Sequence, residues 1–177
     1  MISHLKIFCA SLLCSGALIA ASASAAEAFK DNESIAALFK IDQDERAAKP
    51  RQPWEVIAQH DTEHAQRAFE LLRDGQIRTP TDYCRAALIF HHGDSLDKKK
   101  MAYSLAWIGF QLDPANKDCA LVSAQAWDRI LITQGKPQWY GTQYGKRDAN
   151  SNLSGLLPID KDAVSNEERA RYGVDPQ

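Results

Sequence analysis

The chain has 177 residues, of which 45% are hydrophobic and 25% are charged, and it carries a formal net charge of −2 at pH 7. These values are typical of one globular domain. They exclude a disordered polyelectrolyte, a collagen-like chain and a multispanning membrane protein. Because basic residues do not outnumber acidic ones, the composition predicts no binding to nucleic acid.

The N-terminal segment has the pattern of a secretory signal. Lys6 is the only charged residue before Glu27, an apolar run covers residues 7–21, and an Ala-Ser-Ala sequence at residues 23–25 resembles a cleavage site. The run is short for a membrane span, and no basic flank follows it. We therefore expect a cleaved signal over residues 1–25 and a single domain over residues 26–177. That domain would be periplasmic or secreted, without stable membrane insertion.

Two cysteines, Cys84 and Cys119, remain after the expected cleavage. An exported protein can join two cysteines in a disulfide, and the alternative is that both pack as small hydrophobic side chains. Both readings stay open, because the distance between the two sulfur atoms depends on the tertiary structure.

Helical periodicity dominates the mature chain. Apolar residues recur three or four positions apart, and Pro or Gly residues separate the segments. The third segment has the clearest start, with Thr79 as cap, Pro80 in the first turn and Asp82 near the positive end of the helix dipole. The predicted helices cover residues 34–48, 54–74, 80–92, 96–112, about 118–134 and 166–172.

The apolar stripes of these helices predict the core. The stripes of the second and fourth helices are expected to be buried along their length, and they comprise Trp54, Ile57, Ala65, Ala68, Leu72, Met101, Leu105, Ile108 and Leu112.

Residues 136–160 differ from the rest, because they are rich in Gly and Pro and contain Trp139, Tyr140 and Tyr144. We expect an ordered loop or extended strap, since these aromatic side chains need burial. The fold class that follows is all-α, a compact helical bundle or a short stack of helical hairpins. The third and fifth helices begin about 36 residues apart, which is loosely similar to the period of tetratricopeptide arrays.

Two carboxylates interrupt the apolar stripes. Asp61 lies four residues after Ile57, and Asp128 lies four residues after Ala124, so both are predicted to face inward. A buried carboxylate costs several kcal/mol unless it is paired and hydrogen-bonded. Each therefore has either a structural partner or a functional task. Arg129 is adjacent to Asp128 but points about 100° away on the helix, so it is expected to meet another segment.

The histidines offer weaker signals. His60 and His64 fit the H-x-x-E-H signature of inverted zinc peptidases, in which two histidines at i and i+4 share a helix face. The downstream Glu ligand of that family is missing, since no Glu occurs between Glu70 and Glu167. A solvated helix face is the competing interpretation, so we expect no metal and no cofactor. His91 and His92 end the third helix, where the dipole favours a protonated imidazole.

A motif near the C-terminus resembles that of an uncharacterised bacterial domain-of-unknown-function family. The pattern is Asp-Arg, then Gly-x-x-Gln, then an aromatic residue followed by Gly-Thr-Gln. The matching residues, including the upstream and C-terminal parts, are Asp128-Arg129, Gly135, Gln138, Tyr140-Gly141-Thr142-Gln143, Thr81-Asp82-Tyr83, Ala86-Ala87, Phe90, His92-Gly93, Pro158, Asp160, Arg169 and Gly173-Val174. The family usually has Gln where His91 stands, so His92 is the matching histidine. The resemblance covers about residues 34–176 and implies a helical domain with no established activity.

Three functional hypotheses follow. The first is a module that binds a small polar ligand or a peptide, with Arg129, Gln138, Tyr140, Thr142 and Gln143 at the binding site. The second is a hydrolase or transferase that uses Asp61 or Asp128 as the base and His92 as the acid or its partner. The third is a structural or partner-binding protein of the cell envelope.

Overall fold

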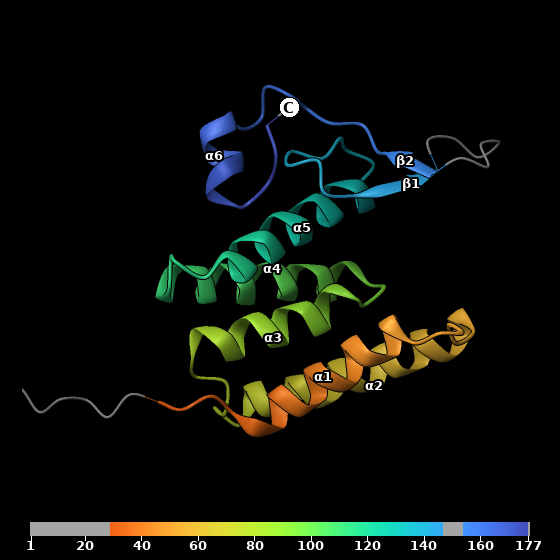
Figure 1. Ribbon diagram of the computed structural model, residues 1–177, viewed down its shortest axis with the longest axis vertical. Helices are drawn as coiled ribbons and strands as arrows, with labels where there is room; N and C mark the ends of the chain where they lie inside the picture. The colour runs from red at the N-terminus through yellow and green to blue at the C-terminus, as the bar shows by residue number, and fades with distance from the viewer. Residues whose placement is uncertain (1–28, 147–153, 177) are drawn as a thin grey trace, which may run out of the picture.

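The computed structural model describes residues 29–146 and 154–176, so the predicted signal over residues 1–25 lies outside the described residues. The described residues form six helices and two short strands (Figure 1). The fold class is all-α, as predicted, and the helix boundaries agree with the sequence to within two residues. The elements are α1 (Glu33–Ala47), α2 (Trp54–Arg73), α3 (Pro80–His91), α4 (Leu96–Leu112), α5 (Lys117–Thr133), β1 (Tyr144–Lys146), β2 (Ser154–Leu156) and α6 (Asn166–Arg171).

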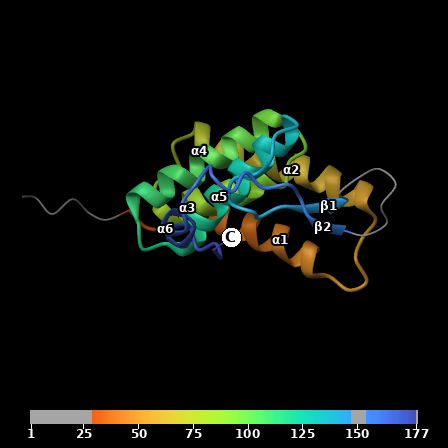
Figure 2. The same cartoon turned by 90° about the horizontal axis from the view of Figure 1, so that it is seen from above.

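The helices are stacked in layers. In Figure 1, α1 and α2 lie side by side at one end, α3, α4 and α5 follow, and α6 and the β1–β2 hairpin cover the other end. Figure 2, seen from above, shows α6 and the hairpin over opposite ends of the helices beneath them. No helix in the described ranges is long and apolar enough to cross a membrane.

Local sequence explains where the helices begin. The predicted cap at Thr79 is confirmed, because its hydroxyl accepts from the Asp82 N–H in a capping box. Asp82 is fully buried, and its carboxylate accepts from the backbone N–H groups of Asn32, Arg78 and Thr79 at 2.8–3.3 Å. Asp82, which was predicted to lie near the positive end of the α3 dipole, therefore also connects the start of α1 to the start of α3.

Small residues allow α3, α4 and α5 to pack closely. Ala86 and Ala87 on α3 and Ala102 and Ala106 on α4 are fully buried. At Gly109 on α4, an added Cβ would lie 2.6 Å from the sulfur of Cys119 on α5 and 3.0 Å from the Pro80 carbonyl oxygen on α3. Only glycine therefore permits the contact at this point.

Three predicted burials are wrong. Trp54 is 65% exposed, Leu112 is 56% exposed and Tyr144 is 69% exposed. Each is the first or last residue of its element, and periodicity gives the face of a residue but not whether a neighbouring element reaches far enough to cover it. The other two strap aromatics, Trp139 and Tyr140, are half-buried and buried.

Cys84 on α3 and Cys119 on α5 form a disulfide, with their Cα atoms 5.1 Å apart. The bridge closes a segment of 35 residues that contains all of α4. It therefore joins the N-terminal halves of α3 and α5, the two helices on either side of α4 in the sequence.

Candidate functional site

A buried charged cluster joins α1, α2 and the C-terminal end of α3. Asp42 and Asp61 are 1% and 5% exposed. The Asp42 carboxylate lies 3.0 Å from Nδ1 of His92 and 3.9 Å from Nδ1 of His64. We call Asp42, Arg46, Asp61, His64 and His92 the Asp42 cluster. The structure thus brings together two of the predicted candidates, Asp61 and His92. Asp42 and Arg46 of α1 join them.

Arg46 lies between the carboxylates of this cluster. It is on the same face of α1 as Asp42, four residues later, so its guanidinium approaches that carboxylate to 3.5 Å. The same guanidinium is bonded to Asp61, and its Nε lies 2.9 Å from Nδ1 of His92. Arg46 therefore supplies the positive charge that these two buried carboxylates require.

Two groups compete for one nitrogen of His92. Nδ1 is within 3.0 Å of both the Asp42 carboxylate and the Arg46 Nε–H. An imidazole nitrogen donates when it carries a proton and accepts when it does not. It can therefore donate to Asp42 or accept from Arg46, but not both at once.

The environment moves the pKa values of the two carboxyl groups in opposite directions. Burial raises the pKa of Asp42, but the hydrogen bond and charge of His92 and the charge of Arg46 outweigh it, so the pKa lies below 3.8. Burial also raises the pKa of Asp61, and here the charges of Arg46 and His92 do not fully offset it. Two neighbouring carboxyl groups with separated pKa values are typical of sites that transfer protons.

The residue types of this cluster also suit a metal ion. Asp42, Asp61 and His92 offer ligand atoms within 4.8 Å of one another. The Arg46 guanidinium already bonds Asp61 and approaches the other two, so a divalent cation would have to displace it against charge repulsion. This arrangement does not favour a metal.

The predicted histidine pair does not converge on one point. Nδ1 of His60 contacts Glu45 at 2.9 Å, whereas Nδ1 of His64 lies nearest to Asp42. Their ring centroids are 6.2 Å apart. The two imidazoles thus face different carboxylates, and His64 belongs to the buried Asp42 cluster rather than to a solvated helix face.

Beside the Asp42 cluster is a cavity of about 590 Å³ between α1, α3 and α5, which we call the α1–α3–α5 cavity. His92 belongs to both, so the cluster reaches the cavity wall through this imidazole. The polar groups that line the cavity are Gln43, Thr81, Arg85, His91, His92, Asn116, Asp118, Gln125 and Arg129.

His91 and Arg129 are the unusual groups of this wall. His91 is 5% exposed, and its Nδ1 has no hydrogen-bond partner in the part of the chain that the structure describes. Burial, together with the charges of Arg129 and His92, lowers the pKa of His91 to about 2, so its imidazole is neutral. Arg129 is half-buried, and among the described residues no carboxylate lies within 4.0 Å of it.

Arg129 is held in place by neutral oxygen atoms of the described residues. One N–H donates to the carbonyl of His91 at 2.7 Å, and Nε donates to Oε1 of Gln143 at 3.3 Å. The prediction that Arg129 contacts another segment of the chain, and not the adjacent Asp128, is confirmed. Burial and the nearby Arg46 lower its pKa.

Asp128 has a different environment. It is fully buried, as predicted, and it accepts four hydrogen bonds of 2.8–3.0 Å from the backbone of Trp139, Tyr140 and Thr142 and from the Thr142 hydroxyl. The strap itself therefore satisfies this carboxylate, which points to an architectural role rather than to proton transfer.

The remaining predicted ligand-binding residues belong to the hydrogen-bond network that holds the strap in place. The Gln138 side chain is fully buried and bonds the backbone of Gln143 and Leu157. The Tyr140 carbonyl accepts from buried Arg169 at 2.7 Å. Gln138, Tyr140, Thr142 and Gln143 do not line the α1–α3–α5 cavity. Of the five predicted residues, only Arg129 does, and Gln143 acts through it.

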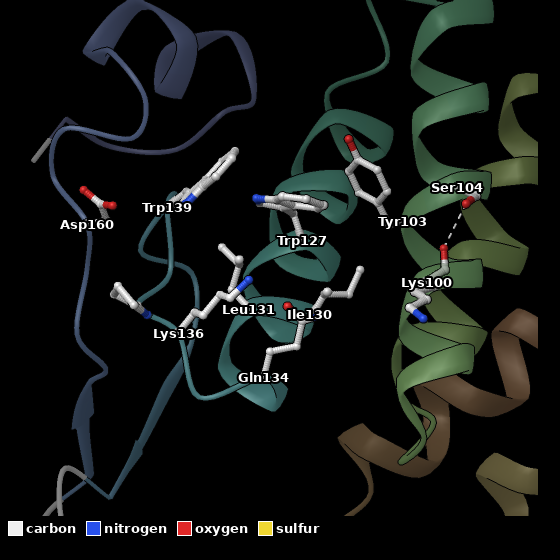
Figure 3. A pocket seen from close by; sticks show the side chains of 11 residues that line it. Lys100, Tyr103, Ser104, Trp127, Ile130, Leu131, Gln134, Lys136, Trp139 and Asp160 are labelled. Carbon is white, nitrogen blue, oxygen red and sulfur yellow. Dashed lines mark hydrogen bonds between the residues drawn. The ribbon is translucent and has the colours of Figure 1, made fainter.

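A second hollow, of about 570 Å³, lies between α4, α5 and the strap. Figure 3 shows Tyr103, Trp127 and Trp139 together, with the indole nitrogen of Trp127 pointing toward Trp139. Neighbouring ring centroids are 5.0–5.1 Å apart, as in aromatic cores. The charged groups at its rim, Lys100 and Asp160 among them, are exposed. This hollow is therefore interpreted as the place where the strap packs against α4 and α5, and not as a ligand site.

Sequence reasoning missed Asp42 and Arg46, although the signal was present. Ile35 and Asp42 are seven residues apart, so they share the inward face of α1. The pattern that identified Asp61 on α2 applies equally to Asp42. Arg46 follows one turn later on the same face.

Replacing Asp42 with Asn should lower the free energy of unfolding by about 2–4 kcal/mol at neutral pH, because Arg46 and His92 lose a buried partner. The native pKa lies below the unfolded value of 3.8, so the stability from the carboxylate is present above pH 3.8 and is lost as the pH falls through the native value. Urea unfolding at several pH values should show the deficit shrinking in acid. Asp61→Asn, whose pKa is raised, should cost less at neutral pH; an equal and pH-independent deficit for both variants would contradict this assignment.

Replacing Asp128 with Asn should lower the free energy of unfolding by about 2–4 kcal/mol, because an amide group would face N–H donors of the strap. Near-UV circular dichroism should also change, since the strap carries Trp139 and Tyr140. Asp175→Asn, at an exposed position near the chain end, is the matched control. Unchanged stability in Asp128→Asn would mean that the carboxylate is retained for a reason other than the fold.

Comparison of the chain with protein-family models, with curated proteins and with solved structures finds no match. The resemblance of the Asp-Arg and Gly-Thr-Gln motifs to an uncharacterised bacterial family therefore stays a prediction.

Proposed function

We propose that this chain is an exported helical protein that binds a small anion, a carboxylate or another oxyanion, in the α1–α3–α5 cavity. The observation that carries the proposal is the guanidinium of Arg129. It is half-buried at the cavity wall, it is oriented by the His91 carbonyl and by Gln143, and no carboxylate lies within 4.0 Å among the described residues.

A buried cation is costly without a counter-charge. Arg46 and Arg85 have carboxylate partners, Asp61 and Asp31 respectively, whereas among the described residues Arg129 is bonded only to neutral oxygens. Guanidinium groups bind carboxylate and phosphate-type oxygens through paired N–H donors. An anion in the cavity would therefore provide the missing counter-charge.

The rest of the wall fits a small polar ligand. The neutral imidazole of His91 has an unpartnered Nδ1, and the amides of Gln43 and Gln125 are neighbours in the same wall. A volume of about 590 Å³ is typical of small-molecule sites. These features favour a small molecule, or the carboxyl end of a peptide, over a folded partner.

Two observations support export. The first 25 residues have the charged, apolar and small-residue pattern of a signal, and the Cys84–Cys119 disulfide suits an oxidising compartment. A periplasmic or secreted location follows as part of the proposal.

Replacing Arg129 with Gln should weaken binding of sulfate and of acetate by about 10- to 100-fold, because a charge-assisted hydrogen bond is lost. Titration calorimetry on the mature protein measures both anions, and their relative affinities distinguish an oxyanion site from a carboxylate site. Arg51→Gln, at an exposed position outside the cavity, should bind as wild type does. Equal affinities in Arg129→Gln and wild type would overturn the proposal.

A second candidate function, acid–base hydrolysis or group transfer, is favoured by the 3.0 Å contact between His92 and Asp42 at the cavity wall. A carboxylate on one imidazole nitrogen orients the ring, so that the other can exchange protons with a substrate. Hydrolysis of p-nitrophenyl acetate should then fall by about 100-fold or more in His92→Gln. The same fall in His60→Gln, whose ring faces Glu45, would show non-specific histidine chemistry instead.

A further inference from the structure

We propose that binding of the anion in the α1–α3–α5 cavity is coupled to the uptake of one proton by His92. This inference rests on the proposed function and adds its regulation, since the anion and the proton would each strengthen the binding of the other. It is carried by the position of His92, which belongs to both the Asp42 cluster and the cavity wall.

The charge balance around His92 supports this coupling. With neutral histidines, Arg46 neutralises one of the two carboxylates of the Asp42 cluster, so the cluster keeps one negative charge, which opposes an anion in the cavity. A proton on His92 cancels that charge, so that the positive charge of Arg129 attracts the anion more strongly. The charged and titratable groups that surround the imidazole are Asp42 and Arg46 from α1, Asp61 and His64 from α2, His91 from α3, and Arg129 from α5.

The competition of Asp42 and Arg46 for Nδ1 of His92 also supports the coupling. When His92 is neutral with its proton on the other nitrogen, Nδ1 accepts from Arg46 and faces the Asp42 carboxylate without a proton between them. When His92 is protonated on both nitrogens, Nδ1 donates to Asp42 and repels Arg46. Each state satisfies one contact and strains the other, so a nearby charge can select between them.

An anion in the cavity is such a charge. It would stabilise the protonated imidazole at the wall by direct attraction, in surroundings where burial reduces the screening by water. His91, although it lines the same wall, is buried beside Arg129 and stays neutral. By linkage, an anion that helps His92 hold its proton must itself bind more tightly at lower pH.

The direction of the pH effect follows from the same linkage. Where His92 is already protonated in the free protein, affinity should be independent of pH. Where it is neutral, affinity should weaken by as much as about tenfold for each pH unit, because one proton is taken up for each anion bound. Arg129 keeps its charge throughout and cannot produce this dependence.

The test is titration calorimetry of the mature protein with sulfate, an anion that does not itself titrate between about pH 5 and pH 8, where histidine does. At one pH the titration is repeated in two buffers of different ionisation enthalpy. The difference in binding enthalpy gives the number of protons taken up for each sulfate bound. A value between zero and one that rises with pH, with a parallel loss of affinity, is the expected result. Acetate, used well above its own titration range, is the carboxylate arm of the experiment.

Variants identify the group that takes up the proton. His92→Gln should bind sulfate through Arg129 with no proton uptake, and its affinity should not vary with pH. Asp42→Asn, which removes the acceptor of the His92 proton while keeping the imidazole, should reduce the uptake, and it serves as a second variant if His92→Gln does not fold. His60→Gln is the matched control and should behave as wild type.

The outcomes separate this inference from the proposed function. Sulfate binding without proton uptake in wild type would overturn the inference and leave the binding site standing. Unchanged uptake in His92→Gln, or loss of uptake in His60→Gln, would assign the proton to another group and also overturn it. Absence of both sulfate and acetate binding in wild type would overturn the proposed function, and the coupling with it.

Discussion

The hydrogen bonds of Asp128 fix residues 139–142 of the strap to α5. This carboxylate on α5 accepts from three backbone N–H groups and one hydroxyl of the strap, so a segment with little regular structure adopts a defined path. That path places Gln143 where its side chain can bond Arg129. Arg129 in turn points at the carbonyl of His91 and the cavity between α1, α3 and α5. The orientation of the Arg129 guanidinium at the cavity wall therefore depends on the Asp128 carboxylate, which does not itself line the cavity.

The molecule contains two kinds of buried carboxylate, and they differ in how their hydrogen-bonding capacity is met. Asp128 and Asp82 accept from backbone N–H groups of segments that they hold in place, so their charges are satisfied within the fold. Asp42 and Asp61 share Arg46, and Asp42 competes with Arg46 for Nδ1 of His92, which also lines the cavity. A network that the fold leaves incompletely satisfied beside a cavity is where binding or proton exchange is expected.

The helices were predictable because their signals are local. The cap at Thr79 and Pro80 marks the start of α3, and the spacing of Ile57, Asp61 and Ala65 marks the buried face of α2. The same spacing indicated that Asp61 and Asp128 face inward, and both do. Local periodicity failed at Trp54 and Leu112, because a terminal residue is buried only if another element reaches it.

The sequence by itself determined the helical class, the boundaries of the helices and the inward direction of the polar residues, since each depends on residues a few positions apart. Only the tertiary structure decided which inward residues meet. It paired Asp42 with His92, 50 residues away, and surrounded Asp128 with hydrogen-bond donors of the strap. Within residues 29–146 and 154–176, it also left Arg129 bonded to neutral oxygens and to no carboxylate. Those partnerships depend on the packing of α1, α2, α3 and α5. Helix periodicity sets the direction of a side chain but carries no information about what stands opposite to it.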